Sequence, residues 1–149
     1  MAQTQTAISA VDCIIQLDNA SGVLTDISGS SNKVSLSFEN GVWEFRPFGN
    51  VWKARGVTGK DADASLDAAY TTADGEALAL LRDWFFGGDD SPRTLQVNIP
   101  DNTPGSDRYQ GEFVLETFPL DLDAGADDVV MVSCTLKPNG EVTHEVITT

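Results

Sequence analysis

The 149-residue sequence contains few positive charges, little cysteine and a single histidine. Nine Lys and Arg stand against 23 Asp and Glu, which gives a formal net charge of −14. This balance argues against a surface that grips nucleic acid, because such surfaces neutralise phosphates with Lys and Arg. No apolar run approaches the roughly 20 residues of a membrane-spanning helix. The first ten residues lack basic residues and an apolar core, so we expect no secretory signal and no membrane anchor.

The few cysteine and histidine residues limit the chemistry that the chain can perform. Cys13 and Cys134 lie in strand-like stretches, where they fit buried, reduced thiols. A disulfide between them stays open, because adjacent strands would bring them together. His144 is the only histidine and lies in the last strand-like stretch, which favours a structural or surface role over a catalytic one. We therefore predict no catalytic residues.

Sequence motifs for cofactors and metals are also missing. No phosphate-binding loop, dinucleotide-binding glycine motif, zinc-protease motif or C-x-x-C pair is present. The acidic turn at 121–128 begins like a calcium loop, but Ala126 replaces the required glycine and Val132 replaces the bidentate glutamate. We therefore predict no cofactor and no metal site.

One segment has the periodicity of an amphipathic helix. Thr72 is a suitable N-cap, acidic residues follow it, and Gly87-Gly88 supplies a left-handed stop, so we expect a helix from 72 to 86. Five apolar residues recur at helical spacing and form one packing stripe. They are Ala77, Leu80, Leu81, Trp84 and Phe85.

Most of the remaining chain alternates apolar and polar residues with the period of a β-strand. Asn40-Gly41 is the strongest hairpin signal, Gly59 to Asp63 predicts another turn, and Pro138 to Gly140 predicts a tight turn before the last strand. The fold class expected is mainly β, an antiparallel β-sandwich or open barrel with one packed helix. It forms a single domain, 1–149, with a flexible N-terminal arm at 1–10. Strands are expected at 11–17, 23–28, 33–39, 42–46, 51–58, 64–70, 94–99, 109–118, 129–137 and 141–147.

Several stretches, taken in order, resemble the tail tube (major tail) proteins of long-tailed bacteriophages and related phage-derived particles. L-D-N-A-S-G-V-L-T-D-I-S-G (17–29) resembles the opening strand, turn and second strand of that family. F-G-N-V-W-K (48–53) resembles the end of its long ribbon loop, and A-L-L-R-D-W (79–84) the end of its helix. Y-Q-G-E-F-V-L (109–115) resembles a strand with a central glycine, and L-K-P-N-G-E-V-T (136–143) the closing hairpin.

The resemblance implies a structural virion protein that forms homo-hexameric rings. The rings stack into a tail tube, assembled in the host cytoplasm, through which double-stranded DNA passes without specific binding. Its partners would be tape-measure, tail-terminator and distal tail proteins. An inter-subunit or inter-ring loop is expected at Arg46, Pro47, Phe48, Gly49, Asn50 and Trp52. Lumen-facing positions are expected at Ser35, Ser37, Glu39, Gln110 and Glu112, where like charge would keep DNA mobile.

Other function classes stay open at this point. A monomeric β-sandwich module would bind carbohydrate through Trp43 or Trp52, or calcium through the acidic turn. Another β-rich virion protein, such as a tail completion or capsid decoration subunit, would share the acidic and cysteine-poor composition. An enzyme has the least support, because no catalytic constellation is present.

Overall fold

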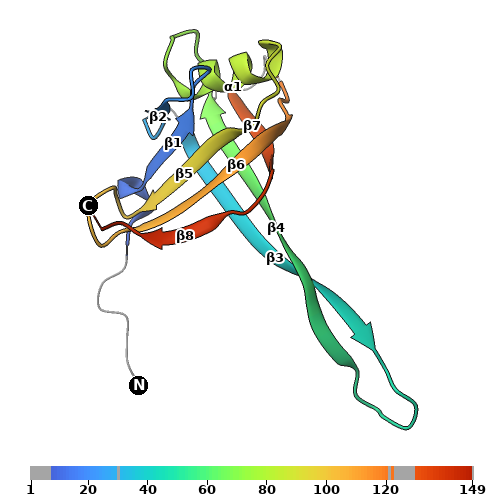
Figure 1. The fold of residues 1–149 in the computed structure, drawn as a ribbon. Coiled ribbons are helices and arrows are strands. Elements are labelled where there is room, and N and C mark those ends of the chain that lie inside the picture. The colour runs from blue at the N-terminus through green and yellow to red at the C-terminus, as the bar shows by residue number, and fades with distance from the viewer. Residues whose placement is uncertain (1–7, 30, 121, 123–129, 149) are drawn as a thin grey trace.

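The computed structural model describes residues 8–29, 31–120, 122 and 130–148. Within them it contains eight strands, one α-helix and one 3₁₀ turn, as coloured in Figure 1. In chain order these are η1 (Ala10–Asp12), β1 (Ile14–Asp18), β2 (Leu24–Asp26), β3 (Ser31–Phe45), β4 (Ala54–Ala69), α1 (Ala77–Phe86), β5 (Arg93–Ile99), β6 (Asp107–Thr117), β7 (Met131–Pro138) and β8 (Thr143–Val146).

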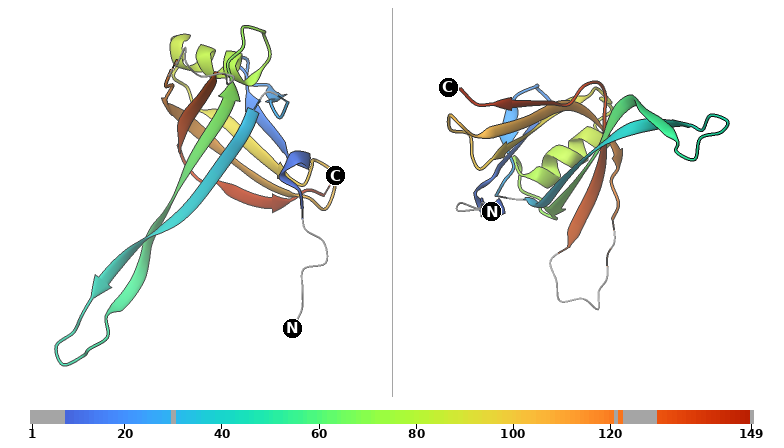
Figure 2. Two further views of the ribbon diagram at one scale, coloured as in Figure 1. Left: turned by 180° about the vertical axis from the view of Figure 1, so that it is seen from behind. Right: turned by 90° about the horizontal axis from the view of Figure 1, so that it is seen from below.

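The strands form one antiparallel sheet in the order β2-β1-β5-β6-β7-β4-β3, with β8 paired to β6. The sheet curls around α1, which lies inside the curve when the molecule is seen from below (Figure 2, right). The prediction of a mainly β, antiparallel fold with one packed helix is therefore confirmed, in the form of an open barrel.

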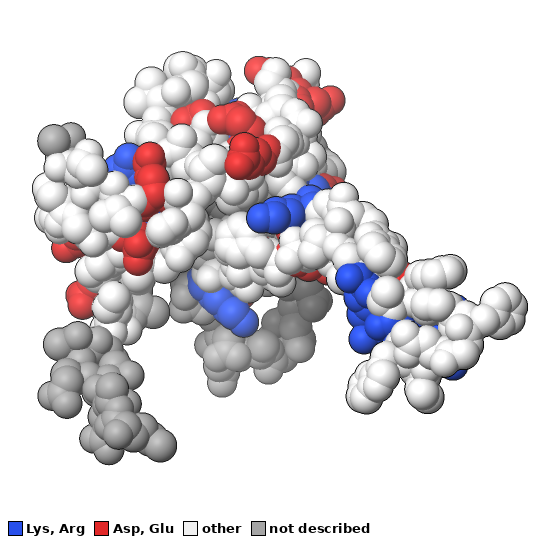
Figure 3. All heavy atoms as spheres, turned by 60° about the horizontal axis from the view of Figure 1, so that its bottom comes forward, with Lys and Arg blue, Asp and Glu red and all other residues white. Residues whose placement is uncertain are grey.

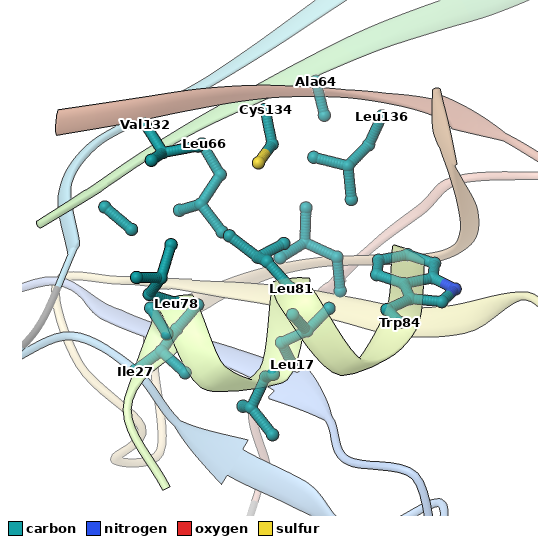
Figure 4. Close-up of a cluster of buried hydrophobic side chains, with 14 of the residues drawn as sticks. Leu17, Ile27, Ala64, Leu66, Leu78, Leu81, Trp84, Val132, Cys134 and Leu136 are labelled. Carbon is teal, nitrogen blue, oxygen red and sulfur yellow. The ribbon is translucent and has the colours of Figure 1, made fainter. Parts of the chain in front are cut away.

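The hydrophobic core lies between α1 and the concave face of the sheet (Figure 4). Alternate residues of β4 and β7 point toward the helix, so that Leu66 and Leu136 are completely buried. Phe113 on β6 is 1% exposed and is among the largest buried side chains. Period-two alternation turns the apolar residues of β4, β6 and β7 toward this core, and α1 packs against them.

The helix is shorter and more widely buried than its sequence pattern predicts. The helix begins at Ala77, so Thr72 does not cap it. Gly75 adopts a left-handed φ of 81°, which is incompatible with helix at that position, and the helix starts only after it. Leu78 is completely buried in addition to the predicted Ala77, Leu80, Leu81 and Trp84. Phe85 differs from the prediction and is 43% exposed, since it lies at the end of the helix beyond the curve of the sheet.

The hairpin turn predicted at Asn40-Gly41 is wrong. β3 runs straight through it, and Gly41 lies at a β-bulge, where a Cβ atom would collide with the Thr58 hydroxyl. The turn predicted at 59–63 is wrong as well, because β4 is continuous there. The real turn lies at residues 46–53, so β3 and β4 form one long ribbon that projects far from the body (Figure 1).

The C-terminal segment does not form the predicted hairpin. β7 and β8 follow one another along the same edge of β6, joined by a bulge rather than by a reversal. The amide of Asn139 donates to the Glu112 carbonyl at 2.8 Å, and the bulge passes close to Gly111. A Cβ atom at Gly111 would lie 2.9 Å from Val142 Cγ2, which explains the central glycine of β6.

The N-terminal stretch and the cysteines also differ from expectation. Val11 is 90% exposed in the 3₁₀ turn, so it does not belong to the predicted strand. Cys13 and Cys134 are free thiols; Cys134 lies on β7, and β1, which follows Cys13, is not adjacent to it in the sheet. Among the described helices, none is long and apolar enough to cross a membrane. Residues 1–7 of the predicted flexible arm lie outside the described residues.

Candidate assembly surfaces

The ribbon formed by residues 40–60 of β3, β4 and their turn, here called the arm, carries large apolar side chains in solvent. At its tip Phe48 is fully exposed, Val51 is 85% exposed and Trp52 is 81% exposed. Five of the six residues of the predicted inter-ring loop are exposed here, and Pro47 is half-buried. Exposed apolar side chains gathered on one surface and rimmed by polar residues are typical of interaction sites.

The arm is ordered by contacts of its own. The Trp43 indole lies against Gly56, where a Cβ atom would come within 2.5 Å of the ring. Glu44 pairs with Lys53 at 3.1 Å and with Arg55 at 3.0 Å across the ribbon. Hydrogen bonds from Arg55 and then Lys53 hold the pKa of Glu44 below its ordinary value. These contacts give the exposed ribbon a defined shape without a hydrophobic core.

Charge divides the molecule into two regions. The arm holds four of the nine Lys and Arg and a single Glu, which gives it a net charge of +3. The rest of the chain therefore carries −17, since the whole chain carries −14. Figure 3 shows blue side chains on the arm that projects to the right, whose tip is white, while red side chains lie mostly over the body. The sequence already contained this signal, but only the structure reveals that these cations share one projecting ribbon.

The predicted lumen-facing residues lie on one face of the sheet, the face away from α1. The register pairs Ser37 with Asp63 and Glu39 with Asp61. These side chains point away from the partly buried Leu36 and its buried partner Ala64. On β6 the same face presents Gln110 and Glu112, beside Gln96 and Thr94 of β5. Lys137 forms an ion pair with Asp63, whose hydrogen bond raises the pKa of that lysine. The predicted residues of β3 and those of β6, far apart in sequence, thus lie on one polar surface.

A row of hydrogen-bonded polar side chains crosses four strands on the same face. Gln96 Nε2 donates to Gln16 Oε1 at 2.8 Å, and Arg108 Nε donates to Asn98 Oδ1 at 3.1 Å. Arg108 also pairs with Glu145 of β8 at 3.3 Å. Asn98 is completely buried and Gln96 nearly so, and both are hydrogen-bonded, as buried polar groups must be. The row ties β1, β5, β6 and β8 together.

The end of the body opposite the arm exposes a second aromatic surface, here called the phenylalanine cluster: Phe85, Phe86 and Phe118. Its ring centroids lie 4.9 to 6.1 Å apart, within the range of favourable aromatic pairs. Behind it, the Trp84 indole donates to the Ser91 carbonyl at 3.1 Å, and the Arg93 guanidinium lies 5.3 Å from the Trp84 ring. Sequence analysis missed Phe86 and Phe118, because they fall outside the helical stripe.

A groove of about 450 Å³ separates the base of the arm from β8. His144 lies here, 2.9 Å from Asp107 and with its ring centroid 5.0 Å from that of Tyr109. The lining mixes aromatic and charged side chains, among them Phe38, Glu39, Lys60, Asp61, Tyr109 and His144.

Neither the histidine nor the cysteines complete a catalytic or metal centre in the described ranges. No group of three or more His, Cys, Asp and Glu that could hold a metal ion is found among residues 8–29, 31–120, 122 and 130–148. Burial and then Asp67 raise the pKa of the Cys134 thiol to about 12, which leaves it inert. Most of the acidic turn lies outside the described residues, so its predicted failure to bind calcium stays a prediction.

These observations define an elongated β protein whose exposed features are an apolar, basic arm and a polar sheet face. A comparison with protein families matches residues 7–144 to the phage tail tube proteins. The chain therefore belongs to the phage tail tube protein family, as its sequence resemblance predicted. No curated protein matches the sequence significantly.

Solved structures share the fold at low sequence identity. A chain from the tail of an empty gene transfer agent particle, refined with C6 symmetry, is 21% identical with a TM-score of 0.69, covering 94% of this chain and all of the other. A chain of the six-fold symmetrised anti-feeding prophage baseplate is 15% identical with a TM-score of 0.72, covering 100% of both chains. The SPP1 tail tube protein is 11% identical with a TM-score of 0.74, covering 96% of this chain and 81% of the other.

Proposed function

We propose that this structural protein forms hexameric rings that stack into the tube of a virion tail, a conduit for DNA during genome delivery. The observation that carries the proposal is the family match over residues 7–144. The six-fold symmetry named for two proteins of the same fold supports the ring number. Assembly takes place in the host cytoplasm, and the role is structural rather than enzymatic.

Unpaired strand edges give a physical reason for ring formation. Among the residues that the structure describes, β3 ends the sheet on one side and pairs only with β4. On the other side β2 ends the sheet and pairs only with β1. Exposed edges of this kind are open to pairing with another chain, and closing them into a barrel removes the liability. Six copies that join edge to edge would close one continuous sheet around a central channel.

The sheet face away from α1 is the surface that we assign to the channel. It carries the predicted Ser35, Ser37, Glu39, Gln110 and Glu112, together with Asp61 and Asp63 at the paired positions of β4. Carboxylates without an excess of Lys or Arg repel phosphates, so DNA would slide along such a wall without binding to it.

The arm and the ends of the tube supply the remaining contacts. Arg46 to Trp52 reach a neighbouring subunit or ring, which explains why such apolar side chains are exposed in the isolated chain. The tube would meet a tape-measure protein inside, a tail-terminator protein at one end and distal tail proteins at the other. Caps and baseplates named for proteins of this fold support partners at both ends.

Negative-stain electron microscopy of the purified protein over a range of concentrations tests the proposal. Six-fold rings at low concentration and hollow rods at high concentration are expected. A mobility-shift assay with double-stranded DNA at low salt should show no binding by the rods, because the wall is acidic. A chain that stays monomeric at every concentration, and whose melting temperature rises with a sugar or with calcium, would instead indicate a ligand-binding module.

A further inference from the structure

Two exposed apolar surfaces lie at opposite ends of the molecule (Figures 1 and 2). One is the arm tip, with Phe48, Val51 and Trp52, and the other is the phenylalanine cluster, where Phe86 is 67% exposed. A surface at one end that fits a surface at the other end makes a head-to-tail contact. Where the rotation between copies does not close, a contact of this kind repeats into an open filament, which is the geometry of stacked rings.

The two surfaces also carry opposite charge. On the arm, Lys53 and Arg55 share the single carboxylate of Glu44, and Arg46 forms no ion pair with any described residue. Around the phenylalanine cluster, residues 82–90 contain three Asp and one Arg, a net charge of −2. None of these aspartates forms an ion pair within the described part of the chain. The arm therefore has an excess of positive charge, and negative charge borders the cluster.

We infer that the arm tip of one copy packs on the phenylalanine cluster of a second copy in the next ring. The inference rests on the proposed tube and names the surface that receives the arm. Phe48 and Trp52 would bury their rings against Phe85 and Phe86, because aromatic side chains bury large areas and prefer aromatic neighbours. Around this apolar centre the arm cations face the aspartates of residues 82–90, which fixes the orientation of the contact.

The groove between the arm base and β8 is the competing receptor on the same molecule. Its lining holds Glu39, Asp61 and Glu141 against Lys60, so its net charge of −2 would also attract the arm cations. Charge alone therefore does not separate the two receptors, but the polar groups of the groove would lose water without a matched partner when the apolar arm tip entered it. The phenylalanine cluster carries less of this penalty, since it presents the exposed rings of Phe85 and Phe86 to an incoming apolar surface.

Disulfide trapping between copies tests the inference directly. The test chain carries Trp52→Cys and Phe86→Cys with Cys13→Ser, and Cys134 stays silent because it is buried with a raised thiol pKa. Mild oxidation of assembled tubes should give a ladder of linked multimers on a non-reducing gel. A matched control pairs Trp52→Cys with Val11→Cys, another exposed position, and should give no ladder. A third chain pairs Trp52→Cys with Val142→Cys in the groove.

The outcomes separate the inference from the proposed function. Tubes that form without a Trp52–Phe86 ladder, or that link position 52 to position 142, overturn the inference and leave the tube intact. Failure of the unmodified chain to form tubes overturns the proposed function and the inference with it.

A charge exchange gives an independent result if the cysteine variants do not assemble. Arg46→Glu and Asp90→Arg should each raise the concentration needed for tubes by about tenfold or more, as an unfavourable charge pair of ~1.4 kcal/mol requires. The double variant restores the attraction with exchanged sign and should assemble close to the unmodified concentration. Single variants that assemble normally, or a double variant no better than either single, would overturn the inference.

Discussion

Strands β3 and β4 run through both the body and the arm of this protein, but their side chains have different surroundings in the two regions. In the body, β4 alternates buried Ala64 and Leu66 with polar neighbours, because a helix covers one face of the sheet. In the arm, the same strand pair has no helix beneath it, and its apolar side chains remain in solvent. The buried side chains of the body stabilise the folded subunit, whereas the exposed side chains of the arm contribute little to that stability and are the ones that we propose for assembly.

The largest expected effect is on the body. Phe113→Ala should lower the free energy of unfolding by about 3–5 kcal/mol, because it leaves a cavity in a core position that is 1% exposed. Chemical denaturation followed by circular dichroism measures the change. Phe48→Ala on the arm is the matched control and should leave the unfolding midpoint of the subunit unchanged. A loss below 1 kcal/mol for Phe113→Ala would contradict the assigned core.

A smaller effect is expected where the helix end is tied to the following loop. Trp84→Phe removes the indole N–H that donates to the Ser91 carbonyl. It also replaces the indole that packs against the Arg93 guanidinium with a smaller phenyl ring. Loss of this hydrogen bond and weakening of the cation–π contact should cost about 1–2 kcal/mol in a denaturant titration. Trp52→Phe changes the same side chain in solvent and serves as the control. An equal loss of unfolding free energy for Trp84→Phe and Trp52→Phe would contradict the assignment of Trp84 to the body and Trp52 to the exposed arm.

A substitution in the arm itself should change local shape and hardly change stability. Gly56→Ala forces the Trp43 indole off the ribbon, because the new Cβ would lie 2.5 Å from the ring. Since that indole is half exposed, it moves into solvent, and the free energy of unfolding should change by less than about 1 kcal/mol. The indole N–H resonance of Trp43 reports the displacement.

Gly59→Ala is the matched control on the same strand, because a Cβ atom there meets nothing within 4 Å. It should leave the Trp43 resonance in place. A Trp43 signal that responds equally to both substitutions would contradict the close packing of Trp43 on Gly56.

The smallest effect on stability is expected at the arm tip. Trp52→Ala should change the free energy of unfolding by no more than about 0.5 kcal/mol, since the side chain is 81% exposed. The same substitution should reduce tube formation, which light scattering measures on the same sample. Destabilisation above 2 kcal/mol would place Trp52 in a core and contradict the division of roles.

The sequence predicts the body well because local patterns there agree with tertiary packing. Period-two alternation and a 3.6-residue stripe each mark a face that meets the core, and α1 and the sheet follow them. In the arm, the same local patterns give a wrong prediction. Asn40-Gly41 carries a strong turn signal, yet a glycine also relieves the close approach of Thr58 at a bulge, and sequence alone does not distinguish these two uses.

Long-range pairing explains the other differences. The bulge between β7 and β8 passes Gly111, so the apparent turn at Pro138 to Gly140 continues along one strand instead of reversing. The phenylalanine cluster combines Phe85 and Phe86 of the helix end with Phe118, which lies just after β6, and no local pattern connects them. The positions predicted for the lumen and for the arm contact stay predictions.

Deletion of residues 47–50, measured for folding and assembly on the same preparation, tests the separation of body and arm most directly. The account predicts an unfolding free energy within about 0.5 kcal/mol of the unmodified chain, because the deletion removes no core residue. It also predicts that electron microscopy finds no tubes at concentrations where the unmodified chain forms them. Undiminished tube assembly, or a subunit that no longer folds, would contradict it.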